Sequence, residues 1–394
     1  MSAAAGAVAT EAERARLNAL FAELCAIPSP SGDEAAVREH VVGLLERAGY
    51  ACAVDAAGNV LTRWSDGPGR GAADGGAGER PSVLLCAHLD TVPHGTIPIE
   101  PVLVDDGWEN ANAAILGADN KAAVAVMLLA AERAAAAGTT WHGPDVELLL
   151  TVAEETALAG AQQFDVAQLR SPFGYVFDHA TPIGGIVVAS PTYYRLEAEF
   201  RGRAAHAGIR PEDGRNAIVA AAHAISAMRT GRIDAETTAN VAHVEGGTSH
   251  TTNIVADRCT LLAEARSLDA DRVEAVVAEM VDRCHDAANE PAYECDLDVA
   301  VARLFEGYRH KPVSPAIVAA ERALAACGHE PVHIVSGGAT DGNAFEAKGF
   351  HTVCLANGTE RNHEPTERVD VAALEGMLDV TFALLDVIAT AAAG

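Results

Sequence analysis

Basic residues are scarce in this chain. Among its 394 residues, 28 Lys and Arg stand against 55 Asp and Glu, so the net charge is −27 with His neutral. Such an excess of negative charge repels phosphate backbones and anionic lipid headgroups, and we therefore expect no nucleic acid and no membrane surface as a partner. The same carboxylates are suited to binding cations.

The sequence also lacks a membrane-spanning run, a secretory signal and paired cysteines. The longest apolar stretch with a helical pattern covers residues 122–131, whereas a bilayer span requires roughly 20 apolar residues. Residues 1–10 have no basic start, and the eight Cys form no C-x-x-C pair. We therefore expect a folded cytoplasmic protein with reduced thiols and no transmembrane segment.

Several nucleophile and nucleotide-binding motifs are missing as well. The chain has no G-x-S-x-G sequence, no cysteine in a recognisable nucleophile motif, no G-x-x-x-x-G-K-[ST] and no G-x-G-x-x-G after a strand. A Ser or Cys hydrolase and a phosphoryl-transfer enzyme are therefore poorly supported.

The N-terminal half of the chain predicts an α/β fold. Two helices are expected first, over Glu11–Cys25 and up to Ala48, with Ser31 or Asp33 capping the second. Residues 65–81 hold six Gly and two Pro and predict a mobile loop. From residue 83 onward, short apolar runs alternate with helical segments, which is typical of a mostly parallel mixed sheet with helices on both faces. The expected strands and helices are residues 83–87, 122–137, 146–153, 157–164 and 175–177.

Around residue 190 the pattern changes. Strands with alternating polar and apolar residues, separated by helices over 213–228 and 270–288, predict an α+β domain. The α/β pattern returns after Glu306. We therefore predict one discontinuous α/β domain of residues 1–191 plus 305–394, interrupted by an α+β domain of residues 192–304.

Acidic and histidine side chains stand where the predicted strands end. His88 follows the strand over 83–87, and Asp90, two residues on, faces the same way if the extended conformation continues. Glu154 and Glu155 end the next strand, and Asp178 ends the one after it. Taken alone, each of these residues is also consistent with an ordinary polar strand end.

Two further residues complete this group. Asp119 directly precedes an apolar helix, where the alternative is a helix N-cap, and His363 follows the strand over 352–355. Because ligands gather at the carboxyl ends of the strands in α/β sheets, these side chains are expected to meet at one edge of the sheet. Two imidazoles and three carboxylates suit two divalent metal ions, and the absence of thiolate favours Zn²⁺, with Co²⁺ or Mn²⁺ as alternatives.

Such a pair of ions would direct the chemistry toward amide hydrolysis. Two metal ions bridged by a carboxylate lower the pKa of a water molecule and so provide a nucleophile for attack on a carbonyl. The acid of the Glu154–Glu155 pair that is not a ligand can take the proton of the water and return it to the leaving amine.

At these residues the sequence resembles the co-catalytic zinc exopeptidase family, which includes peptidase T, carboxypeptidase G, aminoacylases and succinyl-diaminopimelate desuccinylase. The resemblance extends over nearly the whole chain. It is carried by His88-Leu89-Asp90-Thr91-Val92-Pro93, Gly117-Ala118-Asp119-Asn120-Lys121, Glu154-Glu155 and His363-Glu364-Pro365. Ala205-His206-Ala207-Gly208, Gly246-Gly247-Thr248 and Asn253-Ile254-Val255 most resemble the peptidase T branch.

The resemblance implies a set of metal ligands. Asp119 would bridge two ions, His88 and Asp178 would bind one of them, and Glu155 and His363 would bind the other. It also implies that the discontinuous domain is catalytic and that the inserted domain is a lid through which the chain forms a homodimer.

Further roles follow from the same resemblance. Asp90 would support the first His ligand, and Glu154 would be the general base. His206 would reach the site of the partner subunit and stabilise the oxyanion. Asn253 and Arg266 match positions near the substrate, where a loop amide and a strand-edge salt-bridge residue are the alternatives.

The expected function is therefore a di-zinc aminopeptidase that acts on short peptides, in particular tripeptides. A carboxypeptidase or an N-acyl-amino-acid amidohydrolase with the same di-metal site is the first alternative, and a metal- or peptide-binding protein without catalysis is the second. Three departures from the family pattern, Asn120, Ala123 and Thr156-Ala157, remove no expected ligand or base.

Overall fold

The computed structural model describes residues 8–66 and 80–391, so that residues 67–79 of the expected loop 65–81 lie outside the described residues. The chain divides into two compact units. The first comprises residues 1–188, 310–336 and 340–394, and the second comprises residues 189–309 and 337–339.

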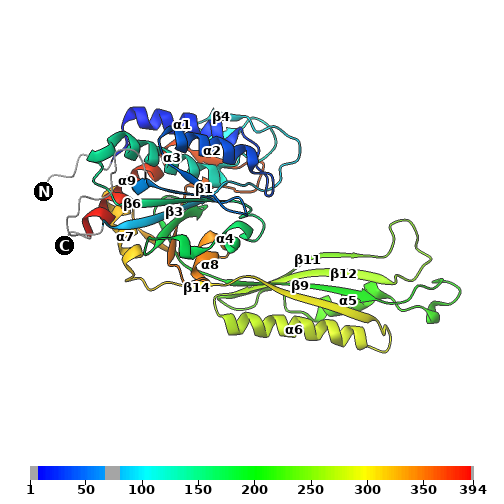
Figure 1. The fold of residues 1–394 in the computed structure, drawn as a ribbon. Coiled ribbons are helices and arrows are strands. Elements are labelled where there is room, and N and C mark those ends of the chain that lie inside the picture. The colour runs from blue at the N-terminus through cyan, green and yellow to red at the C-terminus, as the bar shows by residue number, and fades with distance from the viewer. Residues whose placement is uncertain (1–7, 67–79, 392–394) are drawn as a thin grey trace. The chain divides into compact units, whose positions relative to one another are not determined.

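A mixed sheet forms the centre of the first unit (Figure 1). Its central strands are parallel and follow the order β6 (Asp145–Thr151), β3 (Ser82–His88), β7 (Gly174–His179) and β16 (Thr352–Ala356). Antiparallel strands flank them, namely β1 (Cys52–Val54), β2 (Val60–Arg63) and β8 (Gly185–Ser190), and β15 (Val332–Val335) pairs with β8. The central strands are buried almost throughout, as their largely apolar sequences indicate. The predicted mixed α/β fold is confirmed.

Helices pack on this sheet. The helix α3 (Ala118–Ala137) contacts β3 and β7, and it is covered by α1 (Glu11–Cys25), α2 (Ala35–Arg47) and α9 (Val371–Ala391). A second group contacts other parts of the sheet or its helices, namely α4 (Ala159–Gln163), α7 (Pro315–Ala326) and α8 (Asp341–Glu346). Figure 1 shows α1, α2 and α3 on one side of β3, and α4 and α8 on the other.

The helix α3 belongs to the core of this unit. Among the described residues, the segment 118–140 is the only helix long and apolar enough to match a membrane span by length and composition. Fifteen of the 20 residues of α3 are buried. Because the helix is surrounded by the sheet and by other helices, it is apolar on all sides.

A small antiparallel sheet in the first unit was not expected from the sequence. Its order is β17 (Thr359–Glu360), β18 (Arg368–Asp370), β5 (Gly107–Asn110) and β4 (Pro101–Val104). Strands of two to four residues are too short to show an alternating pattern. This sheet holds both ends of the loop 361–367, which contains His363.

The second unit is an antiparallel sheet with two helices. Its strands are β10 (Gly231–Arg232), β11 (Thr237–Gly246), β12 (Arg258–Ser267), β9 (Thr192–Arg201) and β13 (Asp296–Phe305), in that order. The helices are α5 (Ala217–Ala227) and α6 (Ala270–Asn289). Alternate residues of β12 are buried against these helices, which explains the alternating sequence.

One short strand and four 3₁₀ turns complete the described elements. In the second unit, β14 (Tyr308–Arg309) pairs with the last two residues of β8. The expected helix over 213–228 begins later, at Ala217, because the side chain of Asn216 accepts hydrogen bonds from the N–H groups of Ile218 and Val219. Single 3₁₀ turns are η1 (Trp64–Asp66), η2 (Gly138–Thr140), η3 (Val166–Gln168) and η4 (Pro211–Asp213).

Candidate metal centre

The carboxyl ends of adjacent parallel strands bring His88 and Asp178 together. His88 is the last residue of β3, and Asp178 lies near the end of β7. Nε2 of His88 is 3.6 Å from Oδ1 of Asp178 and 3.4 Å from Oδ1 of Asp119. The imidazole of His88 is only 1% exposed. This buried ring therefore lies between two carboxylates.

Asp119 reaches the site from the irregular start of α3. The N-cap residue of this helix is Gly117, whose φ of +74° is a left-handed conformation that favours glycine, while Asp119 and Asn120 have non-helical dihedral angles. The expected alternative, an N-cap role for Asp119, is therefore wrong. Oδ2 of Asp119 accepts a hydrogen bond of 2.8 Å from Nδ2 of Asn362 and lies 3.4 Å from Nε2 of His363.

Asp90 holds the turn that carries Glu154 and Glu155. Its Oδ1 accepts a hydrogen bond from the backbone N–H of Glu154 at 3.0 Å, and its Oδ2 accepts one from the N–H of Glu155 at 3.1 Å. Its backbone carbonyl lies 3.0 Å from Nδ1 of His88. Asp90 therefore orients residues from two strand ends.

Ser31 also binds Asp90, although the sequence predicted Ser31 or Asp33 as the cap of the helix α2. The hydroxyl of Ser31 donates to Oδ2 of Asp90 at 2.7 Å. The N-cap residue of α2 is Glu34, which makes no side-chain cap hydrogen bond. The expected cap at Ser31 or Asp33 is therefore wrong, because the Ser31 side chain is engaged at the site.

The turn after β6 contains unusual backbone conformations. Ala153, Ala157 and Leu158 have φ values of +51°, +55° and +62°. Left-handed conformations are unfavourable for residues with a side chain, and they concentrate at functional turns. Ala157 is one of the departures from the family pattern noted in the sequence, and it occupies a conformation that glycine would adopt without strain.

His363 closes the other side of the group. Its Nε2 lies 2.8 Å from Oε1 of Glu155, and its side chain is 50% exposed, whereas that of Glu155 is 9% exposed. The structure thus brings seven of the predicted residues into one cluster of the first unit. They are His88, Asp90, Asp119, Glu154, Glu155, Asp178 and His363.

The acidic groups of this cluster disfavour one another's ionisation. Burial raises the pKa of Glu154 well above its usual range, and the charge of Asp178 adds to the effect. Burial likewise raises the pKa of Asp178, with a further contribution from Asp119. Burial alone would lower the pKa of His88, but the carboxylates of Asp178, Asp119 and Asp90 raise it well above its usual value. The site therefore favours additional positive charge.

His363 experiences the same field. Its hydrogen bonds to Asp119 and Glu155 raise the pKa of His363 to about 10. Burial would raise the pKa of Asp119, but His363 and His88 outweigh this effect and hold the pKa of Asp119 below its usual range.

The residues fit a pair of metal ions. Within the described part of the chain, Nε2 of His88 and Oδ1 of Asp119 are buried atoms that make no hydrogen bond. Two sets of potential ligand atoms lie within 4.8 Å of one another, namely His88, Asp119 and Glu155, and His88, Glu154 and Asp178. Burial of polar atoms without partners is unfavourable, and divalent ions bound by nitrogen and oxygen ligands would satisfy them.

Two acidic residues near the site were not among the residues predicted to form it. Oε2 of Glu367 accepts hydrogen bonds from the N–H groups of Leu116 at 2.8 Å and Gly117 at 2.7 Å, and Oε1 accepts one from Asp119 at 2.9 Å. Burial raises the pKa of Glu367 to about 7. Asp341 accepts a hydrogen bond from the Thr151 hydroxyl, and burial raises its pKa to about 6. Glu367 does not stand at a predicted strand end, so no local pattern marked it.

The remaining predicted residues belong to the second unit. His206 is exposed, and its Nδ1 accepts a hydrogen bond from the N–H of Gly208 at 3.2 Å. The backbone carbonyl of Asn253 accepts a hydrogen bond from Ala207. Arg266 forms a 3.0 Å ion pair with Glu264. The roles expected for His206, Asn253 and Arg266 stay predictions.

Comparison with known proteins shows which family of proteins the chain resembles. The model of the M20 peptidase dimerisation domain matches residues 192–291, and the model of peptidase family M28 matches residues 70–179. The aminopeptidase PepT from Bacillus cereus is 33% identical, with 98% of this chain and 100% of that chain covered and a TM-score of 0.83.

Two further solved structures are similar. A tripeptidase from Staphylococcus aureus is 29% identical over 96% of this chain and 99% of its own, with a TM-score of 0.85. A dinuclear metal-binding peptidase of the M20 family from Bacillus subtilis is 19% identical over 96% of this chain and 99% of its own, and its TM-score of 0.71 shows a shared fold. Because the similarity to PepT extends over nearly the whole length of both proteins, the chain belongs to the M20 family of peptidases and is similar to its peptidase T members.

Proposed function

We propose that this chain is a metal-dependent aminopeptidase that hydrolyses tripeptides. The observation that carries the proposal is the meeting of His88, Asp119, Glu155, Asp178 and His363 around buried nitrogen and oxygen atoms that lack hydrogen bonds. The similarity to the B. cereus aminopeptidase and the S. aureus tripeptidase supports the substrate class.

In this proposal Asp119 would contribute a ligand oxygen to each of two divalent ions. Its Oδ1 faces His88 and its Oδ2 faces His363, so the two oxygens point toward different sets of ligands. His88 and Asp178 would hold one ion, and Glu155 and His363 would hold the other. Nitrogen and oxygen donors without thiolate favour Zn²⁺, with Co²⁺ or Mn²⁺ as alternatives.

The bound ions would polarise the scissile carbonyl and lower the pKa of a water molecule. Glu154 would accept the proton of that water and deliver it to the leaving amine. Its burial and raised pKa suit a group that must take up a proton and release it again. Asp90 would act as a positioning residue, because it holds the backbone of Glu154 and the ring of His88.

The second unit would form the dimer interface and contribute residues to the site. The match to a peptidase dimerisation domain supports a homodimer formed through this unit. We assign His206 to oxyanion stabilisation across the dimer, and Asn253 and Arg266 to substrate binding. We also propose a cytoplasmic location, which the eight free thiols support.

The test compares a free tripeptide with its N-acetylated form. We expect zinc-loaded protein to cleave tri-alanine and to leave N-acetyl-tri-alanine intact, and we expect a chelator to abolish the cleavage. Cleavage of the acetylated peptide would instead indicate a carboxypeptidase or an N-acyl-amino-acid amidohydrolase. Binding of both peptides without cleavage would indicate a protein that has lost catalysis.

A further inference from the structure

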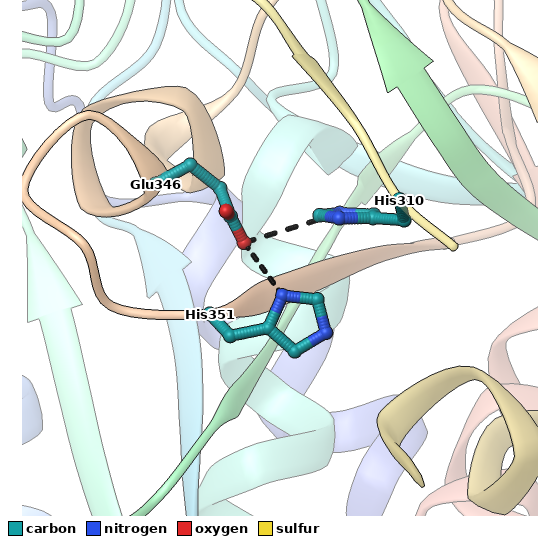
Figure 2. A group of neighbouring side chains, drawn as sticks. All are labelled: His310, Glu346 and His351. Carbon is teal, nitrogen blue, oxygen red and sulfur yellow. Dashed lines mark hydrogen bonds and ion pairs between the residues drawn. The ribbon is translucent and has the colours of Figure 1, made fainter. Parts of the chain in front are cut away.

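A second cluster of potential metal ligands lies apart from the residues discussed so far. It consists of His310, Glu346 and His351, which come from three segments of the first unit. His310 follows β14, Glu346 is the last residue of α8, and His351 directly precedes β16. Figure 2 shows the three side chains pointing toward one another, with the carboxylate of Glu346 facing both rings. None of these residues belongs to the proposed peptidase centre.

The ligand atoms are close enough to share one ion. Oε1 of Glu346 is 2.9 Å from Nδ1 of His351 and 4.0 Å from Nε2 of His310. The two imidazole rings are 4.7 Å apart between centroids and nearly perpendicular, at 89°. In a tetrahedral site with bonds of about 2.0–2.2 Å, neighbouring ligand atoms are about 3.3–3.6 Å apart, so the two distances from Glu346 would each change by about half an ångström. All three ligand atoms already lie within 4.8 Å of one another.

From this arrangement we propose that His310, Glu346 and His351 form a separate mononuclear zinc site. Two imidazole nitrogens and one carboxylate oxygen are the donor set that suits Zn²⁺, and solvent would supply a fourth ligand. The ion would replace the proton shared between Glu346 and His351. The proton of the His351 ring would then reside on Nε2, so the charge of that ring does not change.

Backbone hydrogen bonds hold two of the proposed ligands in place. The backbone N–H of Thr352 donates to Oε1 of Glu346 at 2.7 Å. His310 also makes a hydrogen bond with the backbone of Thr352. Such contacts fix the orientation of a ligand ring or carboxylate. His310 is 3% exposed, Glu346 21% and His351 32%. The ion would therefore reach its buried ligand from the side of the two partly exposed ones.

The position of the cluster indicates a structural role. An ion there would link the segment that begins at His310 to the end of α8 and the start of β16. The opposite end of α8 carries Asp341, whose carboxylate is bound to Thr151 at the end of β6. Zinc would therefore stabilise the placement of α8 on the sheet, and binding to the folded state alone would raise the melting temperature.

The test is metal stoichiometry of the full-length protein. Protein stripped with a chelator is equilibrated by dialysis against buffered free Zn²⁺, and bound zinc is counted by mass spectrometry. We expect His351→Asn to bind one equivalent less than the wild type, to lose part of the zinc-dependent rise in melting temperature, and to retain the wild-type kcat for a tripeptide. Glu346→Gln, which keeps the shape of the side chain, is expected to show the same loss if His351→Asn folds poorly.

The chain offers a matched control. His333 pairs with Glu321 at 2.8 Å through a single His–Glu contact of similar exposure, so His333→Asn is expected to bind as much zinc as the wild type. Equal zinc stoichiometry in wild type, His351→Asn and Glu346→Gln would overturn the proposal. Because the readout is the difference of one equivalent, it is independent of whether the peptidase centre also binds metal.

Discussion

Replacement of Glu367 by Gln is expected to loosen the turn that carries Asp119. The carboxylate of Glu367 accepts two N–H groups on Oε2, from Leu116 and Gly117, and one on Oε1, from Asp119. A glutamine has a single carbonyl oxygen. If that oxygen keeps the first two hydrogen bonds, its NH₂ group faces the N–H of Asp119, and this buried donor is left without an acceptor.

The expected cost follows from these contacts. A buried donor that loses its partner costs about 1–3 kcal/mol, and the remaining hydrogen bonds lose the strength that the charge gives them. The free energy of unfolding should therefore fall by about 2–4 kcal/mol. Because the displaced group is the backbone of Asp119, the affinity for a divalent ion should fall as well, by about 10–100-fold.

Urea unfolding of the metal-free protein and metal competition with a chelator measure the two effects. The assay is best made near pH 8, because burial raises the pKa of Glu367 to about 7 and the carboxylate must be ionised. Glu364→Gln in the same loop is the matched control, since Glu364 is exposed. An unfolding free energy for Glu367→Gln within about 0.5 kcal/mol of that control would refute the reasoning.

Three further predictions concern the site turn and a distant ion pair. Asp90→Asn should reduce kcat/KM by about 10–100-fold, because the amide NH₂ of the asparagine must face the backbone N–H of either Glu154 or Glu155. Unchanged kinetics would exclude the positioning role of Asp90. Ala157→Gly should raise the free energy of unfolding by about 0.5–1 kcal/mol, because it relieves a left-handed alanine; a loss of stability in urea would contradict this. Hydrogen bonding to Arg133 lowers the pKa of Glu13 to about 2, so the native state stabilises the ionised form. This contribution is fully present above about pH 4.5 and is lost as the pH falls through about 2. Glu13→Gln should therefore cost about 1 kcal/mol at pH 7, allowing for solvent screening, and clearly less near pH 2, and a cost independent of pH would contradict the assignment.

The sequence predicted the parts of the cluster that depend on strand order. His88, Asp178 and the Glu154-Glu155 pair follow apolar runs, and the ends of parallel strands meet at one edge of a sheet whatever the details of packing. The same reasoning could not separate a helix cap from a ligand at Asp119. That distinction depends on the backbone, because the N-cap residue of α3 is Gly117 and Asp119 has non-helical dihedral angles inside the helix.

The residues that were missed act through partners far away in the chain. Glu367 binds backbone N–H groups about 250 residues earlier, and Ser31 donates to Asp90 instead of capping α2. Neither contact leaves a periodic or short-range signal. The small sheet that holds the loop of His363 was missed because its strands are too short for an alternating pattern.

In the proposed reaction, Glu154 would transfer protons beside two ions held by the other members of the cluster. The most direct measurement is the turnover of a tripeptide by Glu154→Gln, made together with a count of the ions bound at the peptidase centre. We expect both ions to remain bound while kcat falls by about 10²–10⁴-fold, the range attributed to a general base. Wild-type turnover by this variant with both ions bound would contradict the account.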